Sequence, residues 1–366
     1  MIILHLSPIN MKTTNGFRFS VPGLVSAQSE IQGIKVALAN VGNRSNLVHS
    51  EIQNFKFDFF EYIEDIGEMK PPYNKPDIVI FHGIYHLKYL KIYKQLLKNK
   101  IPYVLVPRVS LTEGAQKQKR IKKIIGNILL FNKFINNCNK IHFLTKNEME
   151  SSKNYNKEYF IIGNGINIPN IQKTRINKYL RITYMGRYDI NHKGLDLLIE
   201  SIAKIKEELK MNNIVLNFYG SDFRKGKKYL EKKIKFYGIQ NIVKINDAVF
   251  GDKKIEILLN TDIFIATSRF EGHPMAVIEA MSYGIPCILT KGTNMVDKLV
   301  EYDAGWEADL SIYSIADTII EAINSKDKLL IKGSNARKLV VENYDWKIIA
   351  LKTIEQYRKI IKSNGG

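Results

Sequence analysis

Short apolar runs bounded by turn residues alternate along the chain with longer amphipathic stretches. Such runs are typical of buried strands, and the stretches between them repeat apolar residues at helical spacing. The predicted strands are Ile2–Ser7, Ile34–Asn40, Asp77–Phe81, Ile101–Val106, Lys140–Leu144, Tyr159–Ile162, Leu180–Met185, Ile214–Tyr219, Ile242–Ile245, Asp262–Ala266 and Cys287–Leu289. The predicted helices include Tyr85–Lys98, Ala115–Asn136, Leu195–Lys210, Lys227–Tyr237, Met275–Tyr283 and Ile312–Ile323. Strands that alternate with helices predict an α/β fold whose parallel sheets carry helices on both faces.

A segment rich in Gly, Asn and Pro, Gly163–Lys178, separates two such strand–helix series and is the predicted interdomain linker. We therefore expect two doubly wound, Rossmann-like domains, over residues 1–168 and 169–345. A final helix over residues 346–366 is expected to pack back on the first domain. Two such domains facing each other would form a cleft at the carboxyl ends of their strands, where ligands bind in this architecture.

Composition narrows the class of protein. The 366 residues are 45% hydrophobic, which supplies ample core material and argues against global disorder. Two cysteines, Cys138 and Cys287, cannot form a disulfide framework and indicate a reducing compartment. The first residues show no secretory signal, and the longest strongly apolar stretch, Ile124–Phe131, is too short to span a membrane. We expect a cytosolic protein.

The charge is unbalanced. The chain carries 55 Lys+Arg against 36 Asp+Glu, a formal charge of +19. Residues 1–175 hold 25 Lys+Arg against 12 Asp+Glu, so most of the basic excess belongs to the first domain. Nucleic acid, an anionic membrane or a phosphorylated substrate would each explain such a charge.

The most informative stretch is Ser268–Pro286, SRFEGHPMAVIEAMSYGIP. It follows an apolar strand, Pro274 fits the first position of a helix, and Gly284 fits the end of that helix. The amides at the start of the helix would then form a seat for a phosphate. These amides belong to Met275, Ala276 and Val277.

Two glutamates accompany this helix start. Glu271 lies in the loop before the helix, and Glu279 lies one turn inside it. A carboxylate at position 279 accepts paired hydroxyls, such as those of a ribose, while the amides hold a diphosphate. The alternative interpretation is an ordinary strand–loop–helix with surface glutamates.

A second stretch, Met185–Ile199, has a strand that ends at Gly186 and a loop that presents Arg187 and Lys193 before a helix. Two cations at the carboxyl end of a strand suit a diphosphate, Arg by its planar fork and Lys as a point charge. They would offset the charge that develops on a departing nucleotide, so that no metal is needed. The alternative is a solvated basic loop.

Several motifs together carry a family resemblance. FEGHPMAVIEAMSYGIP resembles the E-x7-E signature of the retaining glycosyltransferases of family 4, which have the two-Rossmann-domain GT-B fold. GRYDINHKGLDLLIESI resembles their G-R-…-K-G diphosphate segment, and FIIGNGINIP resembles their interdomain stretch. The resemblance spans nearly the whole chain and is strongest from Gly163 to Pro286.

The resemblance implies roles for individual residues. Glu279 matches the glutamate that binds the donor ribose, and Glu271 matches the one that faces the transferred sugar and its phosphate. Arg187 and Lys193 match the diphosphate pair, and the amides of residues 275–277 match the phosphate-binding helix start. In the first domain, Asn15 and Gly16 match the family's Gly-rich donor loop only in part, because Phe17 replaces its usual second glycine.

A larger departure lies at VPRVSLT, residues 106–112, where related sequences have a Pro-His-Gly-Ser segment. Arg108 and Val109 occupy the His and Gly positions. Arg108 is expected either to bind a phosphate or acidic sugar or to form a structural salt bridge. His82 follows a predicted strand of the first domain and resembles a recurrent family position. It is either a donor or acceptor contact or a packed, satisfied histidine.

Other chemistries are unsupported. The sequence contains no H-E-x-x-H, G-x-S-x-G, P-loop or Cys/His metal spacing, and no G-x-G-x-x-G nicotinamide motif. No Asp-x-Asp pair occurs either, which argues against the metal-dependent type of sugar transferase. We expect no metal and no cofactor other than the nucleotide-sugar substrate.

A dense basic patch, Lys117–Lys123, begins an amphipathic stretch in the first domain. It is either the solvated end of a domain helix or a contact with an anionic inner membrane leaflet. Nucleic-acid binding is disfavoured because neither interleaved aromatics nor a reader motif accompanies the charge.

The sequence therefore predicts a metal-independent, retaining glycosyltransferase that uses a UDP- or GDP-sugar. Its predicted acceptor is a glycan or lipid-linked glycan of surface polysaccharide biosynthesis (capsule, O-antigen or lipopolysaccharide). It is expected in the cytoplasm or peripherally on the inner face of the plasma membrane. The alternatives are a GT-B-fold nucleotide-sugar epimerase, which needs no acceptor, and a non-enzymatic basic scaffold on anionic membrane.

Overall fold

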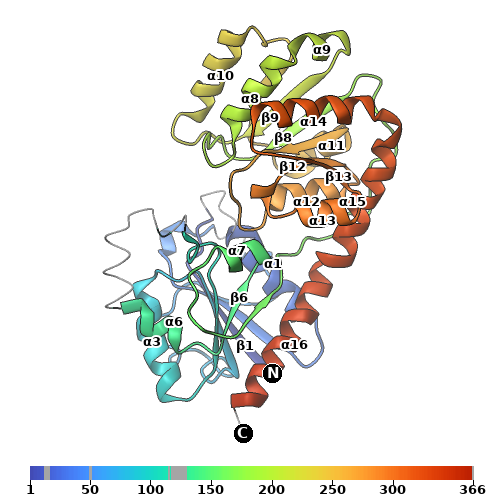
Figure 1. The fold of residues 1–366 in the computed structure, drawn as a ribbon. Helices are drawn as coiled ribbons and strands as arrows, with labels where there is room; N and C mark the ends of the chain where they lie inside the picture. Colours follow the sequence, from blue (N-terminus) through green and yellow to red (C-terminus); the bar gives the residue numbers. More distant parts are fainter. Residues whose placement is uncertain (12–16, 49–51, 114–115, 117–129, 365–366) are drawn as a thin grey trace. The chain divides into compact units, whose positions relative to one another are not determined.

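The computed structural model describes residues 1–11, 17–48, 52–113, 116 and 130–364. The chain divides into two compact units (Figure 1). Unit 1 comprises Met1–Ile166 together with Asp345–Gly366, and unit 2 comprises Asn167–Tyr344. The carboxy-terminal segment is thus part of unit 1.

Unit 1 is built on a seven-stranded parallel sheet. Its strands, in hydrogen-bonded order, are β3 (Asp58–Phe60), β2 (Lys35–Asn40), β1 (Ile2–Ser7), β4 (Ile78–His82), β5 (Tyr103–Val106), β6 (Lys140–Phe143) and β7 (Tyr159–Ile161). Its helices are α1 (Phe17–Ser29), η1 (Arg44–Asn46), α3 (Leu87–Lys98), α6 (Asn132–Asn136), α7 (Lys146–Glu150) and α16 (Trp346–Asn364).

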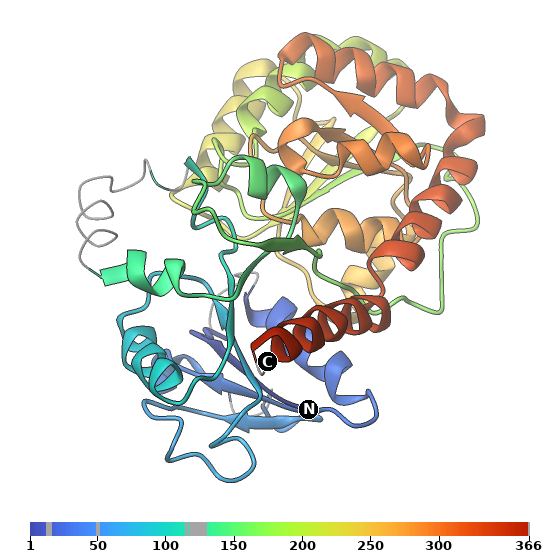
Figure 2. The ribbon, with the colours of Figure 1, turned by 60° about the horizontal axis from the view of Figure 1, so that its bottom comes forward.

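Alternate residues of the unit 1 strands enter two different cores, as the two-residue period of a strand requires. Leu4 and Phe81 pack with α3 and α6 on one face. Ile3 and Ile80 pack with α1 and α16 on the other. The helices α1 and α16, far apart in sequence, lie side by side (Figure 2). The ring of Trp346 lies so close to α1 that a Cβ on Gly23 would stand 2.6 Å from it.

Unit 2 is built on a six-stranded parallel sheet. Its strands, in hydrogen-bonded order, are β10 (Val243–Asp247), β9 (Val215–Gly220), β8 (Arg181–Met185), β11 (Ile263–Ala266), β12 (Cys287–Thr290) and β13 (Gly305–Ala308). Its helices are α8 (Leu195–Lys204), α9 (Lys206–Met211), α10 (Gly226–Tyr237), α11 (Gly251–Leu259), α12 (Met275–Ser282), η3 (Lys291–Thr293), α13 (Val296–Glu301), α14 (Ile312–Asn324), η4 (Lys326–Lys328) and α15 (Leu329–Asn343). Its largest core packs α8, α10 and α14 against β8 and β9.

The predicted fold class, α/β with two Rossmann-like sheets, is confirmed. All the predicted strands are present, and the sequence missed two short edge strands, β3 and β13. The helix predicted over Leu195–Lys210 is broken at Ile205, whose backbone leaves the helical region (φ −107°, ψ 23°). The beginning of the predicted Ala115–Asn136 helix lies outside the described residues. No helix in the described part of the chain is long and apolar enough to cross a membrane.

Candidate functional site

The candidate site in unit 2 lies at the carboxyl ends of β8 and β11. Gly194 lies in the loop after β8, where it contacts the loop after β11. Gly194 precedes α8 with φ +62°, a left-handed conformation that favours glycine. A Cβ at this position would stand 2.1 Å from the carbonyl oxygen of Thr267. The Thr267 hydroxyl donates to the carbonyl of Lys193 at 3.1 Å. The loop that carries Arg187 and Lys193 is therefore fixed against the loop that carries Glu271.

Lys193 and Glu271 form an ion pair at the junction of these loops. The Ser268 hydroxyl donates to the same carboxylate oxygen at 2.8 Å, and the Asn294 amide donates to the Glu271 backbone carbonyl. Burial opposes ionisation of Glu271, but the charges of Lys193 and His192 and the hydrogen bonds to the carboxylate outweigh it. The pKa of Glu271 is therefore lowered from its usual value, and the carboxylate is ionised at neutral pH.

A second ion pair, between Arg269 and Asp196, fixes the loop that contains Glu271. The Arg269 guanidinium binds the Asp196 carboxylate of α8 through two hydrogen bonds, of 2.8 and 2.7 Å. It also donates to the carbonyl of Asn191 at 2.8 Å. A bidentate pair of this kind fixes orientation as well as distance. Arg269 precedes the glutamate by two residues, yet the sequence interpretation gave it no role.

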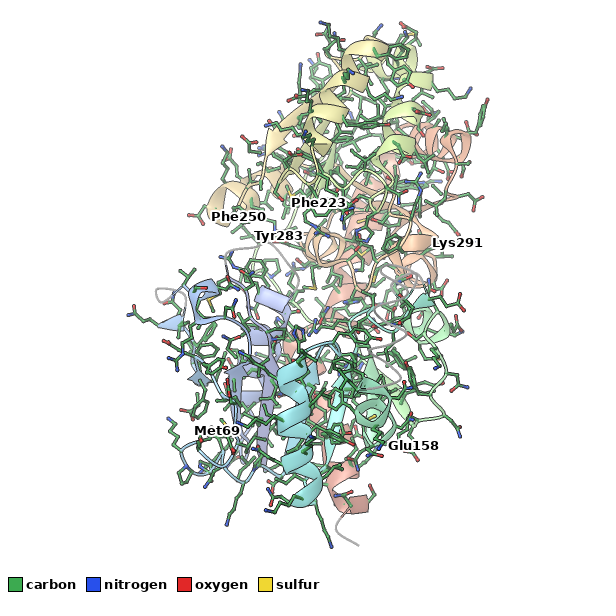
Figure 3. The ribbon with its side chains drawn as sticks, turned by 90° about the vertical axis from the view of Figure 1, so that its left-hand side faces the viewer. Met69, Glu158, Phe223, Phe250, Tyr283 and Lys291 are labelled. Carbon is green, nitrogen blue, oxygen red and sulfur yellow. The ribbon has the colours of Figure 1, made fainter. Side chains whose placement is uncertain are left out.

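Arg187, the other predicted diphosphate ligand, is partly exposed at the end of β8. Its guanidinium lies 5.0 Å from the ring centroid of Phe223, which belongs to the loop after β9 (Figure 3). Its backbone carbonyl accepts a hydrogen bond from the Tyr184 hydroxyl at 2.9 Å. Among the described residues, no carboxylate lies within ion-pairing distance of this guanidinium. Phe223 holds the arginine in place without neutralising its charge.

The predicted helix start at Met275 is present in α12, although Pro274 was expected to be the first helical residue. Pro274 is the N-cap, and α12 begins at Met275 without a side-chain cap. The amide of Val277 donates to the Pro274 carbonyl at 3.0 Å, so the expectation of three available amides is reduced to two, those of Met275 and Ala276. The helix ends at Ser282, and Gly284, which was predicted to mark the helix end, follows the C-cap with φ +76°.

Glu279 lies on α12 and forms an ion pair with Lys254 of α11. Both side chains are about one-quarter exposed, 25% for Glu279 and 27% for Lys254, so the pair is open to solvent. The sequence interpretation missed Lys254. It lies 25 residues before the glutamate, in a helix with several charged residues, and no local pattern distinguishes it.

In unit 1, His82 and Arg108 meet at the carboxyl ends of β4 and β5. His82 is fully buried, and its two ring nitrogens face His5 and Arg108. The structure therefore places His82 to orient Arg108, and a direct contact with substrate would need this interior to open. The partly exposed Arg108 also contacts Ser20 and Asn164. Asn15 and Gly16 lie outside the described residues, as does the basic patch at Lys117–Lys123.

Among the described residues, no cluster of three or more His, Cys, Asp or Glu side chains is arranged to hold a metal ion. The charged groups of the unit 2 site include the carboxylates Glu271 and Glu279 and the cations Arg187, Lys193 and Lys254, on neighbouring loops and helices. Such a set can bind a polyanion that also presents hydroxyl groups.

Comparison with known proteins assigns this unit. Residues 168–339 match the family model described as glycosyl transferases group 1, which covers nearly all of unit 2. The resemblance drawn from the motifs is confirmed. The sucrose-phosphate synthase of Thermosynechococcus elongatus has the same fold, with a TM-score of 0.75 at 15% identity over 99% of each chain. The two units together have the GT-B fold.

Two curated relatives match at lower coverage. An uncharacterized glycosyltransferase of Methanocaldococcus jannaschii is 25% identical over 221 residues, which cover 56% of this chain and 53% of the relative. The GDP-mannose:cellobiosyl-diphosphopolyprenol alpha-mannosyltransferase of Xanthomonas oryzae pv. oryzae is 27% identical over 176 residues, 48% of this chain and 45% of the relative. The matched part of the chain spans about half the length of these relatives.

Proposed function

We propose that this chain transfers a sugar, with retention of its anomeric configuration, from a nucleoside diphosphate sugar to a glycan or lipid-linked glycan. The observation that carries the proposal is the convergence of Arg187, Lys193, Glu271 and the start of α12 at the carboxyl ends of the unit 2 strands. Parallel α/β sheets bind their ligands at this edge. The family match of the same residues supports a sugar donor as that ligand.

In the proposed donor site, Arg187 and Lys193 bind the diphosphate, and the amides of Met275 and Ala276 receive one of its phosphates. Glu279 accepts hydrogen bonds from the ribose hydroxyls, and Glu271 accepts them from the transferred sugar. Lys193 and Lys254 neutralise these two carboxylates in the ligand-free protein. Donor binding then exchanges carboxylate–ammonium contacts for contacts with sugar and phosphate, so the carboxylates are never left buried and unpaired.

The proposed reaction breaks the bond between the anomeric carbon and the β-phosphate oxygen. The acceptor hydroxyl forms the new bond on the same face, and its proton passes to the departing phosphate oxygen. The nucleoside diphosphate therefore leaves with the added proton, and atoms and charge balance. Arg187 and Lys193 stabilise the negative charge that grows on the phosphate, which is the task that a metal performs elsewhere. We propose a reaction without a metal on this ground.

The proposed acceptor class follows from one relative and from the charge of the chain. The Xanthomonas relative is named for a lipid diphosphate-linked disaccharide acceptor and a GDP-sugar donor. The basic excess of residues 1–175 suits an anionic membrane surface or a phosphorylated acceptor. We therefore propose a surface-polysaccharide acceptor on the inner leaflet, and a cytoplasmic or peripheral location.

A binding experiment tests the donor site without knowledge of the acceptor. UDP-glucose, UDP-N-acetylglucosamine and GDP-mannose are each added to the full chain, and the melting temperature is recorded. A ligand at a hundred times its Kd adds about 2.7 kcal/mol, which raises the Tm by several degrees. If no nucleoside diphosphate sugar shifts the Tm, the proposal fails, and tight binding to anionic vesicles would then favour a scaffold.

Two variants assign the roles. With the donor identified, Lys193→Ala and Glu279→Ala are each expected to lower sugar transfer by about 100- to 1,000-fold, because each removes a charged contact with the donor. Lys298→Ala and Glu301→Ala are the matched controls, since they break an exposed Lys–Glu pair on α13. Full activity of both site variants would contradict the assignment, and donor sugar epimerised without acceptor would favour an epimerase.

A further inference from the structure

One face of the unit 2 sheet carries polar side chains at β9. Burial along this strand alternates, as the two-residue period of a strand requires. Leu216 and Phe218 pack into the core with α8 and α10. Val215, Asn217 and Tyr219 therefore point to the opposite face, where each is partly exposed. Because the strands of a parallel sheet are usually apolar and buried on both faces, a polar and partly open face at β9 needs an explanation.

A hollow of about 510 Å³ lies on this face, a volume within the range of ligand pockets. β8 runs parallel to β9, with Arg181 beside Val215 and Thr183 beside Asn217, and all four residues line the hollow. α11 borders the hollow through Glu256. Every residue that the structure places in the lining belongs to unit 2, so the hollow is formed within this unit alone.

The fold leaves several polar groups of this hollow unused. Five of the lining side chains make no hydrogen bond or ion pair with another described residue: Arg181, Asn213, Asn217, Tyr219 and Glu256. By contrast, the Thr183 and Thr261 hydroxyls, which also line the hollow, bond to each other at 2.7 Å. Burial raises the pKa of Tyr219, and the nearby Arg181 charge opposes this rise, so these two side chains lie close enough to interact. The hollow therefore offers donors and acceptors that are available to a ligand.

The lining suits a neutral ligand that is rich in hydroxyl groups. Its charged residues, in the described part of the chain, are one cation, Arg181, and one carboxylate, Glu256, so their charges balance. An arginine only donates, a carboxylate only accepts and an amide does both, which together match the hydroxyls of a sugar. Tyr179 and Tyr219 add aromatic rings, which combine an apolar surface with a polar hydroxyl. A pyranose ring presents a similar combination, with C–H groups on its faces and hydroxyls along its edge.

We propose that this hollow is a second saccharide-binding site, which holds a neutral segment of the glycan acceptor. The proposal rests on the proposed function, which supplies the glycan. Arg181 and Val215 are the first residues of β8 and β9, so the hollow reaches the amino ends of these strands, whereas the proposed donor site lies at the carboxyl ends. The five residues of β8 separate these two edges by about 13 Å. A chain that is held at such a remote site keeps its other end at a raised local concentration.

Titration of the full chain with neutral oligosaccharides tests the site. The probes are maltohexaose, cellohexaose, mannohexaose and N-acetylchitohexaose, and at least one is expected to bind whether or not UDP or GDP is present. Arg181→Ala should weaken this binding by about tenfold to a hundredfold and Asn217→Ala by about two- to tenfold, the ranges for charged and neutral hydrogen bonds. Arg175→Ala and Asn241→Ala, at exposed positions outside the hollow, are the matched controls and leave the affinity unchanged.

The variants are expected to fold, because the side chains of Arg181 and Asn217 have no hydrogen bond to another described residue that could be lost. The Tm of each should therefore lie within about 2 °C of the wild type. If either variant fails to fold, Tyr219→Phe takes its place, since it removes only a hydroxyl from the lining. It should weaken the binding of the same oligosaccharide by about two- to tenfold. Unchanged affinity in the folded variants overturns the proposal.

The outcomes separate this proposal from the function on which it rests. If the wild type binds a nucleoside diphosphate sugar but none of the four oligosaccharides, the saccharide site is wrong and the donor site stands. If an oligosaccharide binds the wild type but not Arg181→Ala, and no nucleoside diphosphate sugar raises the Tm, the hollow stands and the proposed function fails. Once an acceptor is known, Asn217→Ala should raise the KM for long acceptors severalfold and leave that for short acceptors and the donor unchanged. Equal KM changes for short and long acceptors would contradict a remote binding site.

Discussion

The candidate sites of the two units differ in the side chains that surround their cations. In unit 2, Lys193 pairs directly with Glu271, and Lys254 with Glu279. In unit 1, the Arg108 guanidinium donates to the Ser20 and His82 side chains, and His82 and the neighbouring His5 are fully buried. A paired site exchanges its partners when a ligand arrives, whereas a neutral network holds one geometry and offers few alternatives.

Acid should reveal this difference most strongly. Burial lowers the pKa of His5 to about 3 and of His142 to about 4, and holds the pKa of His82 well below 6.5. Below pH 6.5 these histidines become protonated in the unfolded chain but stay neutral in folded unit 1. The free energy of unfolding of unit 1 therefore falls as the pH falls. Each histidine lowers the free energy of unfolding by about 1.4 kcal/mol per pH unit, and the three together lower it by about 4 kcal/mol per pH unit. Glu271 has a lowered pKa, so its loss begins only below its unfolded value of 4.5.

The two tryptophans make this measurable, because Trp346 belongs to unit 1 and Trp306 to unit 2. Trp306→Phe leaves a fluorescence reporter for unit 1, and Trp346→Phe leaves one for unit 2. Urea unfolding at pH 7.5, 6.5 and 5.5 is expected to show a falling midpoint for unit 1 and a smaller fall for unit 2, where burial also lowers the pKa of His192. A constant midpoint for the Trp346 signal would remove the buried histidines as the distinguishing feature of unit 1.

Part of this contrast was visible in the sequence. Ser268, Glu271, Glu279 and the start of α12 lie within one continuous stretch, so a linear pattern could predict them. The unit 1 network could not be predicted in this way. It joins His5, Gln28, His82 and Thr353, positions that only the parallel sheet and the return of α16 bring together. Of these side chains, the sequence singled out only His82, and each of the others alone looks like an ordinary core or surface residue.

The elements of the fold were likewise predictable only where their pattern is continuous in the sequence. The long apolar strands could be predicted because a run of five or six buried residues gives a stronger signal than the conformational preferences of single residues. The three residues of β3 give too short a pattern, and the break at Ile205 depends on how α8 and α9 pack, which a continuous apolar period does not show. Lys254 was missed for a related reason, since its partner Glu279 lies on another helix.

A second prediction concerns the loop contact that supports the unit 2 pairs. Gly194→Ala places a Cβ 2.1 Å from the Thr267 carbonyl at a positive φ, so the loops of Lys193 and Glu271 must separate. We expect a loss of about 3 kcal/mol in stability and a large loss of donor affinity. Gly238→Ala is the matched control, because Gly238 has φ +66° with open space around it, and it should cost about 1 kcal/mol. Equal costs for the two variants would show that the Gly194 contact is unimportant.

The smallest expected effect lies at Val109 in unit 1, the position where related sequences carry glycine. Val109 has φ +62°, which is unfavourable for a β-branched residue, and its amide donates to the buried carboxylate of Glu148. Val109→Gly keeps this amide and removes the strain, but it adds chain entropy to the unfolded state. Relief of the strain outweighs this entropy, so we expect a gain of about 0.5–1 kcal/mol and a Tm higher by about 1–3 °C. Val109→Ala, which still carries a Cβ, should gain less. A fall in Tm for Val109→Gly would mean that the backbone at this position stores no strain that glycine can relieve.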